Sequence, residues 1–173
     1  MAGGSWNNDG LTPAHPSAWC KCNQDWTSVI IPTSNQTQLS IADVKTGFKV
    51  FKLWKYGVPE KEYFLVENRQ KTKFDKYLPG AGLLVWHIDD NLSENSDETH
   101  YKVALMQADG LKQLESAANQ GDAGDTFPGS ANNKSITKST TPNTRSYGDV
   151  DTLVSLKNIS ASAATMSADV AVK

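Results

Sequence analysis

Carboxylates on glycine-bearing turns are the side chains of this sequence best suited to hold an ion. One turn is Asp109-Gly110, and a second is the run Gly121-Asp122-Ala123-Gly124-Asp125. Closely spaced carboxylates on such turns can converge several oxygen atoms on a hard cation such as calcium. The spacing is not that of the twelve-residue EF-hand loop, and a solvated acidic turn is the alternative. The candidate calcium ligands are Asp109, Asp122, Asp125, Asp89 at the end of a predicted strand, and backbone carbonyls of the glycine-rich turn.

The histidines of the chain do not form a zinc-peptidase motif. Only His15, His87 and His100 are present, and no two are four residues apart, as the histidines of a His-Glu-x-x-His helix are. Cys20 paired with a distant histidine is a conceivable nucleophile and base, but no neighbouring residue supports it. Cys20 and Cys22 are two residues apart in a predicted helix, on nearly opposite faces, so we expect no disulfide between them.

Polar residues inside two predicted strands are expected to be structural. His87 shares a strand face with Leu83 and Val85, where a hydrogen-bonded core histidine is more common than a ligand or a base. The run Glu67-Asn68-Arg69 ends a second buried strand. Charges so close to a core more often form a satisfied network than a catalytic pair.

Composition and charge exclude several classes of protein. With 173 residues, 38% hydrophobic and 21% charged, the chain is long enough and apolar enough for one globular domain. A formal net charge of -2 gives no electrostatic reason to expect a nucleic-acid or anionic-membrane partner. No apolar run approaches the about 18 residues of a membrane span, and residues 1–6 lack the blocks of a signal peptide. We therefore expect no nucleic-acid partner, no membrane partner and no export signal within this chain.

A hydrophobic period of two from Thr37 onward predicts a mainly β fold. The predicted strands are Gln38–Val44, Phe48–Tyr56, Glu62–Asn68, Gly82–Asp89, Lys102–Ala108, Thr152–Ile159 and Thr165–Val172. The first four are expected to form an antiparallel meander. Tyr63–Val66 and Leu83–Trp86 are apolar on both faces, so these two strands are predicted to be central and covered on both sides.

Helical periodicity is strongest near the beginning of the chain. Thr12 can cap a helix that has Pro13 in its first turn. Trp19, Cys22 and Trp26 then recur at i, i+3 and i+7, so one apolar face of this helix is expected to dock on another part of the protein.

A second, short amphipathic helix is predicted after Asp109-Gly110 from the spacing of Leu111, Leu114 and Ala118. It is followed by about thirty residues, Asn119–Asp151, that are rich in Gly, Asp, Asn, Ser and Thr. A loop of this length inside a compact domain is usually functional, disordered or held by a ligand.

Several blocks of the sequence occur in an order that is similar to a known family. They are Met1–Trp6 (MAGGSW), Thr12–His15 (TPAH), Ser17–Trp19 (SAW), Tyr63–Gln70 (YFLVENRQ), Phe74–Asp89 (FDKYLPGAGLLVWHID), Gln107–Gly110 (QADG) and Gly121–Gly129 (GDAGDTFPG). These blocks resemble the M6 (immune inhibitor A-like) metallopeptidases from just after their zinc-binding helix. The chain departs from the family pattern at Pro16, usually a larger apolar residue, and at Cys20-Lys21-Cys22, usually charged or polar positions.

The resemblance implies a secreted bacterial endopeptidase in which a His-Glu-x-x-His-type helix binds zinc and its glutamate activates the bound water. Met1 matches the methionine of the family's Met-turn, beneath the zinc site, and fits an initiator methionine equally well. The zinc ligands are then expected upstream, so zinc and protein substrates belong to the full-length enzyme and this chain alone is expected to be inactive.

The same resemblance implies how the chain is divided. Residues 1–26 would be the Met-turn and following helix of the catalytic domain, and residues 27–173 a mainly antiparallel β-subdomain with one short helix and a long Gly/Asp-rich loop. The missing upstream catalytic subdomain is the expected partner.

A free-standing β-sandwich binding or accessory module without catalysis is the alternative interpretation. Aromatics such as Trp54 and Trp86 would then contact carbohydrate or protein. Trp86, however, belongs to the apolar strand face Leu84-Trp86-Ile88, as core residues do. An exposed planar row of aromatics would favour the module over the enzyme fragment.

Overall fold

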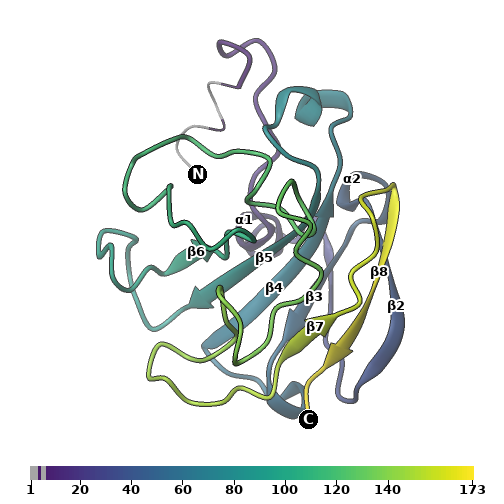
Figure 1. The fold of residues 1–173 in the computed structure, drawn as a ribbon, viewed down its shortest axis with the longest axis vertical. Coiled ribbons are helices and arrows are strands. Elements are labelled where there is room, and N and C mark those ends of the chain that lie inside the picture. The colour runs from purple at the N-terminus through teal and green to yellow at the C-terminus, as the bar shows by residue number, and fades with distance from the viewer. Residues whose placement is uncertain (1–3, 5–6) are drawn as a thin grey trace.

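The computed structural model describes Gly4 and residues 7–173, which form a mainly β fold of two sheets (Figure 1). Met1, the candidate Met-turn residue, lies outside the described residues. The five-stranded sheet has the order β1 (Ser28–Ile30), β3 (Lys49–Leu53), β4 (Glu62–Arg69), β5 (Gly82–Asp89), β6 (Val103–Leu105). The three-stranded sheet, at the right of Figure 1, has the order β2 (Gln36–Ala42), β8 (Thr165–Ala171), β7 (Ser155–Lys157). The predicted mainly β fold class is confirmed.

The predicted four-strand meander is wrong in its first strand. β3, β4 and β5 pair antiparallel in sequence order, as predicted. β2 instead pairs with β8 in the other sheet, with Ile41 opposite Met166. β1, which was not predicted, runs parallel to β3. A period of two indicates which face of a strand is buried, but the backbone groups of a strand can pair with any neighbour, so the partner is decided by tertiary packing.

β4 and β5 are the central strands, as predicted. They pair along their whole length, from Glu62 opposite Asp89 to Arg69 opposite Gly82. Every residue of β5 and every residue of β4 after Glu62 is buried. Helix α1 (Ala18–Asn23) and strand β2 both contact β4, and one hydrophobic core joins the two sheets. Because other parts of the protein pack against both faces of these strands, apolar residues follow one another directly in their sequences.

α1 is shorter than the predicted helix at both ends. It begins after Ser17, whose hydroxyl accepts a hydrogen bond from the Cys20 backbone N–H at 3.3 Å. Pro16 disfavours helical backbone in the residue before it, which stops the helix from starting at Thr12. Trp19 and Cys22 pack against the core, as the predicted apolar face requires. Trp26 does not, because the helix ends at Asn23 and Trp26 is 58% exposed.

Buried charges attach α1 to the central strands. Lys21 Nζ donates to Glu67 Oε2 at 2.6 Å, and both side chains are buried. Trp86 Nε1 donates to the other oxygen of the same carboxylate at 3.2 Å. Asn68 Nδ2 donates to the Ile41 carbonyl at 2.9 Å, which links β4 to β2. The predicted structural role of Glu67-Asn68-Arg69 agrees with these contacts.

Asp75 is the second anion of this buried network. Arg69 Nη2 lies 2.6 Å from Asp75 Oδ1, and Lys45 Nζ lies 3.2 Å from Asp75 Oδ2. The backbone N–H of His15 donates to Asp75 Oδ1 at 2.9 Å. Burial alone would raise the pKa of Asp75, but the Arg69 and Lys45 charges and these hydrogen bonds outweigh it and hold the pKa below its usual value.

The segment from β6 to β7 is built of turns rather than a helix and an open loop. The helix predicted after Asp109-Gly110 is not formed, because Lys112 and Ala117 adopt left-handed backbone conformations and Leu111 is exposed. The following residues are anchored by single backbone bridges, Phe127 to Leu83 and Ile136 to Leu156. Phe127 and Ile136 are fully buried, so the long Gly/Asp-rich segment is held to both sheets by its own apolar side chains.

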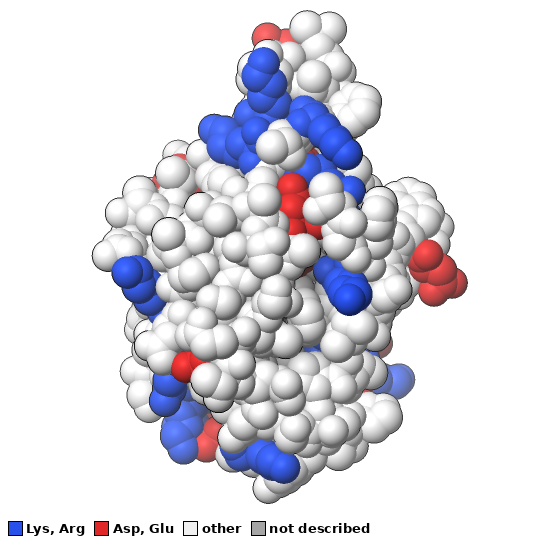
Figure 2. Space-filling view, turned by 90° about the vertical axis from the view of Figure 1, so that its right-hand side faces the viewer, with Lys and Arg blue, Asp and Glu red and all other residues white. Residues whose placement is uncertain are grey.

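A group of Lys and Arg side chains lies at one end of the face made by the three-stranded sheet. Figure 2 shows this group at the top of the face, with further Lys and Arg side chains scattered among uncharged residues below. The turn at that end, η3 (Lys73–Tyr77), follows exposed Lys71 and carries exposed Lys73 and Lys76, while Asp75 between them is buried. Within the part of the chain that the structure describes, none of the helices is long and apolar enough to cross a membrane.

Candidate functional site

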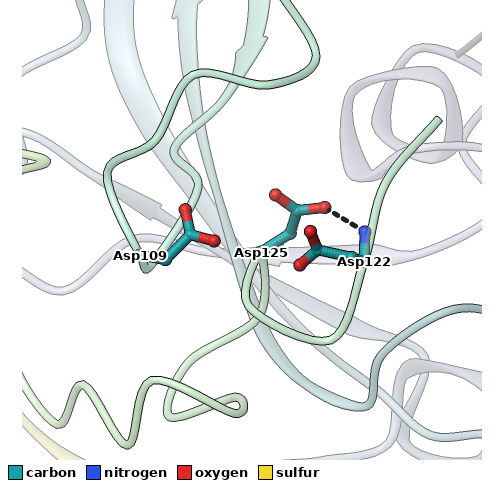
Figure 3. A group of neighbouring side chains, drawn as sticks. All are labelled: Asp109, Asp122 and Asp125. Carbon is teal, nitrogen blue, oxygen red and sulfur yellow. Dashed lines mark hydrogen bonds between the residues drawn. The ribbon is translucent and has the colours of Figure 1, made fainter. Parts of the chain in front are cut away.

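Three of the four predicted calcium ligands lie together. Asp109 follows β6, whereas Asp122 and Asp125 belong to the Gly121–Gly129 turn. One carboxylate oxygen of each residue lies within 4.8 Å of the others, and Figure 3 shows the three carboxyl groups turned toward one another. Among Gly4 and residues 7–173, this is the one group of three or more His, Cys, Asp or Glu side chains close enough to share an ion.

Backbone hydrogen bonds bring the two turns together. The Asp109 N–H donates to the Gly124 carbonyl and the Ala108 N–H to the Asp125 carbonyl, both at 3.1 Å. On the other side, Phe127 and Leu83 exchange two backbone hydrogen bonds of 2.9 and 2.8 Å. The carboxylates are therefore positioned by backbone pairing with β5 and with the end of β6.

Most oxygens of the three carboxylates already accept hydrogen bonds. Asp122 accepts from the Gly124 N–H at 2.6 Å and from Asn119 Nδ2 at 2.8 Å, and Asp109 Oδ1 accepts from the Leu111 N–H at 3.0 Å. Asp125 Oδ2 accepts from the Asp122 N–H at 2.7 Å, as the dashed line in Figure 3 marks. Asp125 Oδ1 is buried and has no hydrogen-bond partner, and the whole residue is only 3% exposed.

The electrostatics of the cluster are unfavourable for three ionised carboxylates. Burial raises the pKa of Asp125 above its usual value, and the neighbouring charges of Asp122, Asp109 and Glu115 raise it further. The hydrogen bond from the Asp122 N–H opposes this rise but does not cancel it. Among the described residues, no lysine, arginine or histidine forms an ion pair with the three aspartates.

Gly124 is required by the close approach of the carboxylates. A Cβ atom at this position would collide with Asp109 Oδ2 and would lie 2.9 Å from Asp122 Oδ1. Any side chain would therefore push Asp109 and Asp122 away from their present positions. The glycine makes the turn compact enough for the three carboxylates to converge.

The prediction of Asp89 as a fourth ligand is wrong. Asp89 ends β5, whereas the Asp125 turn pairs with Leu83 near the beginning of that strand. At a rise of about 3.3 Å per residue along a strand, Leu83 and Asp89 are about 20 Å apart. Asp89 Oδ1 accepts hydrogen bonds from Asn91, and Asp89 Oδ2 lies 2.9 Å from His100 Nε2. The sequence places Asp89 at the end of a strand, but it does not indicate which end of that strand lies beside the acidic turn.

A histidine cluster that sequence reasoning missed lies at this far end of β5. His87 is stacked between Phe64 and Tyr147, with ring centroids 4.4 and 4.2 Å away, and its Nε2 lies 2.9 Å from Glu62 Oε1. His100 also contacts the Tyr147 ring, at 3.8 Å between centroids. His87 is buried and hydrogen-bonded, in agreement with the predicted core histidine. No local pattern links Tyr147 to β5, so only the folded chain reveals this contact.

A groove of about 1220 Å³ lies beside the aspartate cluster. Its walls come from the N-terminal segment through α1, from β6, and from the turn that carries Asp122 and Asp125. Apolar side chains in the walls include Trp19, Leu84, Trp86 and Leu105. Trp86, like Trp54, is only 7% exposed, so neither tryptophan contributes to an exposed row of aromatics.

The described residues do not fit a zinc site. Zinc in proteins is usually held by three or four His, Cys or carboxylate ligands. His15 packs on Phe74, His87 pairs with Glu62, and His100 pairs with Asp89, and among the described residues none of these histidines belongs to a group of three possible metal ligands. The aspartate cluster offers oxygen ligands alone. No catalytic step that depends on zinc is therefore assigned to these residues.

Comparison with known proteins adds no relative of this chain. No family model, no curated protein and no solved structure matches it. A function for this chain therefore rests on the resemblance of its sequence blocks and on the geometry of its own residues.

Proposed function

We propose that this chain is the downstream, β-rich part of the catalytic region of a secreted M6-type zinc endopeptidase. In this proposal an upstream subdomain would supply the zinc ligands and the general base, and zinc held there would activate the water for hydrolysis of protein substrates. The chain described here supplies the scaffold beside that site. We expect the chain by itself to be inactive, because its described residues offer no three-ligand zinc set.

The convergence of the family-like blocks in space is the observation that carries this proposal. Tyr63–Gln70 forms most of β4, and the second half of Phe74–Asp89 forms β5, its pairing partner. Gln107–Gly110 and Gly121–Gly129 meet through the Asp109–Gly124 backbone hydrogen bond. The Leu83–Phe127 bridge joins these two pairs of blocks, so four of the blocks form one structural unit, which supports their origin in one enzyme region rather than in chance matches.

The placement of the N-terminal block also supports an upstream partner. Thr12–His15 and Ser17–Trp19 lead into α1, which borders the groove, and buried Lys21 attaches this helix to Glu67. Trp26, beyond the end of α1, is largely exposed. A further subdomain packed against Trp26 would bury this side chain, and burial of one such aromatic is worth roughly 2–3 kcal/mol.

The decisive experiment begins with the DNA immediately upstream of the codon for Met1. We expect an in-frame His-Glu-x-x-His motif there. A protein that includes this upstream segment should cleave casein, lose activity with a chelator and regain it with zinc. Replacement of the motif's glutamate by glutamine should abolish cleavage without loss of folding.

Two results would contradict the proposal. One is an upstream region with no such motif in frame. The other is zinc-dependent casein cleavage by the purified 173-residue chain alone, since the described residues contain no site for it.

A further inference from the structure

We propose that Asp109, Asp122 and Asp125 bind one calcium ion, which fixes the Gly121–Gly129 turn against the end of β6 and forms part of the groove wall. This inference does not depend on the peptidase assignment. It rests on the geometry of the three carboxylates and on the buried, unsatisfied oxygen of Asp125.

The spacing of the oxygens fits a calcium ion. Calcium–oxygen bonds are about 2.3–2.6 Å long, so two oxygens on opposite sides of the ion are at most about 5 Å apart. The three carboxylate oxygens lie within 4.8 Å of one another. They can therefore share an ion with no movement of the backbone that holds them.

Asp125 Oδ1 is an independent indication of a ligand. A buried carboxylate oxygen without a partner is unfavourable, and more so when it is charged. Figure 3 places Asp125 between Asp109 and Asp122, with its unpaired oxygen on the side away from the Asp122 N–H. A water molecule would satisfy this oxygen but would leave the repulsion among three anions. A divalent cation removes both penalties.

The donor set favours calcium over other common ions. All three side chains offer oxygen, and no histidine or cysteine joins the cluster, which disfavours zinc and copper. Magnesium requires near-ideal octahedral geometry and keeps several of its waters, so an all-protein oxygen cluster suits it poorly. Asp122 and Asp125 line the groove, so water can complete the six to eight ligands of calcium from that side.

The test is thermal unfolding of the whole chain in excess chelator and in calcium, with binding followed by titration calorimetry. We expect about one calcium per chain and a higher Tm in calcium. At free calcium of about 100 times the Kd the stabilisation is about 2.7 kcal/mol, or roughly 5–11 °C for a chain of this size. Magnesium or zinc at the same concentration should give a smaller shift.

Asp125→Asn separates loss of binding from loss of folding. The amide keeps an acceptor for the Asp122 N–H and removes one of the three charges. In chelator this variant should unfold at or above the wild-type temperature, and calcium should not change its Tm. Asp25→Asn, at an exposed aspartate outside the cluster, should retain the full calcium response.

An unchanged wild-type Tm in calcium, with no binding heat, would overturn the proposal. So would a full calcium response in Asp125→Asn. Either result would leave the test of the upstream zinc motif unaffected, so failure of the calcium site and failure of the peptidase assignment are distinguishable.

Discussion

Two groups of buried or half-buried charges in this protein differ in how their charges are balanced. Under α1, three cations are paired with three anions in short contacts, among Lys21, Lys45, Arg69, Asp43, Glu67 and Asp75. Beside β6, three carboxylates converge with no cation among the described residues. The positive and negative charges of the first group balance one another within the chain. The negative charge of the second group is balanced only by an added ion.

The pKa directions of the two groups reflect this difference. Asp75 and Asp125 are both desolvated by burial, which raises the pKa of a carboxylic acid. Around Asp75 the cations of Arg69 and Lys45 reverse the effect, and the pKa falls. Around Asp125 the other nearby charges are anions, and the pKa rises. The direction in which the pKa of a buried acidic residue moves thus depends on the charges around it and not on burial alone.

Asp75→Asn is expected to give the largest loss of stability. Removing one partner of a buried ion pair leaves uncompensated charge and is unfavourable by about 3–5 kcal/mol. We expect about 3 kcal/mol, the lower end of that range, because Asp43 still faces Lys45 at 3.1 Å. Urea unfolding measures the change, and Asp25→Asn, at an exposed position, should change the free energy by less than about 0.5 kcal/mol. Equal effects of the two variants would show that the ion pairs of Asp75 do not stabilise the fold.

Gly124→Ala is expected to remove the calcium response while preserving the fold. The added methyl group would collide with Asp109 Oδ2 and displace a proposed ligand. The expected loss is the whole calcium stabilisation, about 2.7 kcal/mol at saturating calcium. Gly148→Ala is the matched control, because a Cβ there meets only Ser146 Oγ at an ordinary 3.7 Å. Thermal unfolding with calcium and with chelator measures both variants, and a calcium response retained by Gly124→Ala would contradict the assigned ligands.

The smallest expected effect is a pH dependence of opposite sign in the two regions. Because the folded-state pKa of Asp125 is raised, the folded chain binds a proton more tightly there, and without calcium its stability increases as pH falls through that pKa. The lowered pKa of Asp75 acts the other way, so its contribution is complete above about pH 3.9 and is lost as pH falls further.

The measurement compares wild type and Asp125→Asn in chelator at pH 7 and at about pH 4.5, above the unfolded-state value of an aspartate. The variant should be more stable at pH 7, and its advantage should shrink at the lower pH as Asp125 becomes protonated. The calcium response of the wild type should shrink over the same range, because protons compete with the ion. An advantage independent of pH would show that Asp125 is not destabilised by its charge.

Several features of this protein were predictable from the hydrophobic periodicity and the side-chain chemistry of short stretches of its sequence. The mainly β fold, the bounds of β5 at Gly82–Asp89 and the central position of β4 and β5 were predictable because burial on both faces leaves continuous apolar runs. Asp109, Asp122 and Asp125 were predictable as a group because glycine-bearing acidic turns are suited to cation binding. Both are properties of short stretches of chain.

Tertiary structure decided the features that depend on which segments meet. β2 joins β8 rather than β3, Asp89 lies at the wrong end of β5 to reach the acidic turn, and Tyr147 stacks on His87 across the fold. The same holds for the unpaired oxygen of Asp125, since its isolation depends on every neighbour that the folded chain places around it. The physical reason is that a sequence pattern specifies which faces of a segment are apolar, whereas partners and unmet hydrogen bonds are set by long-range packing.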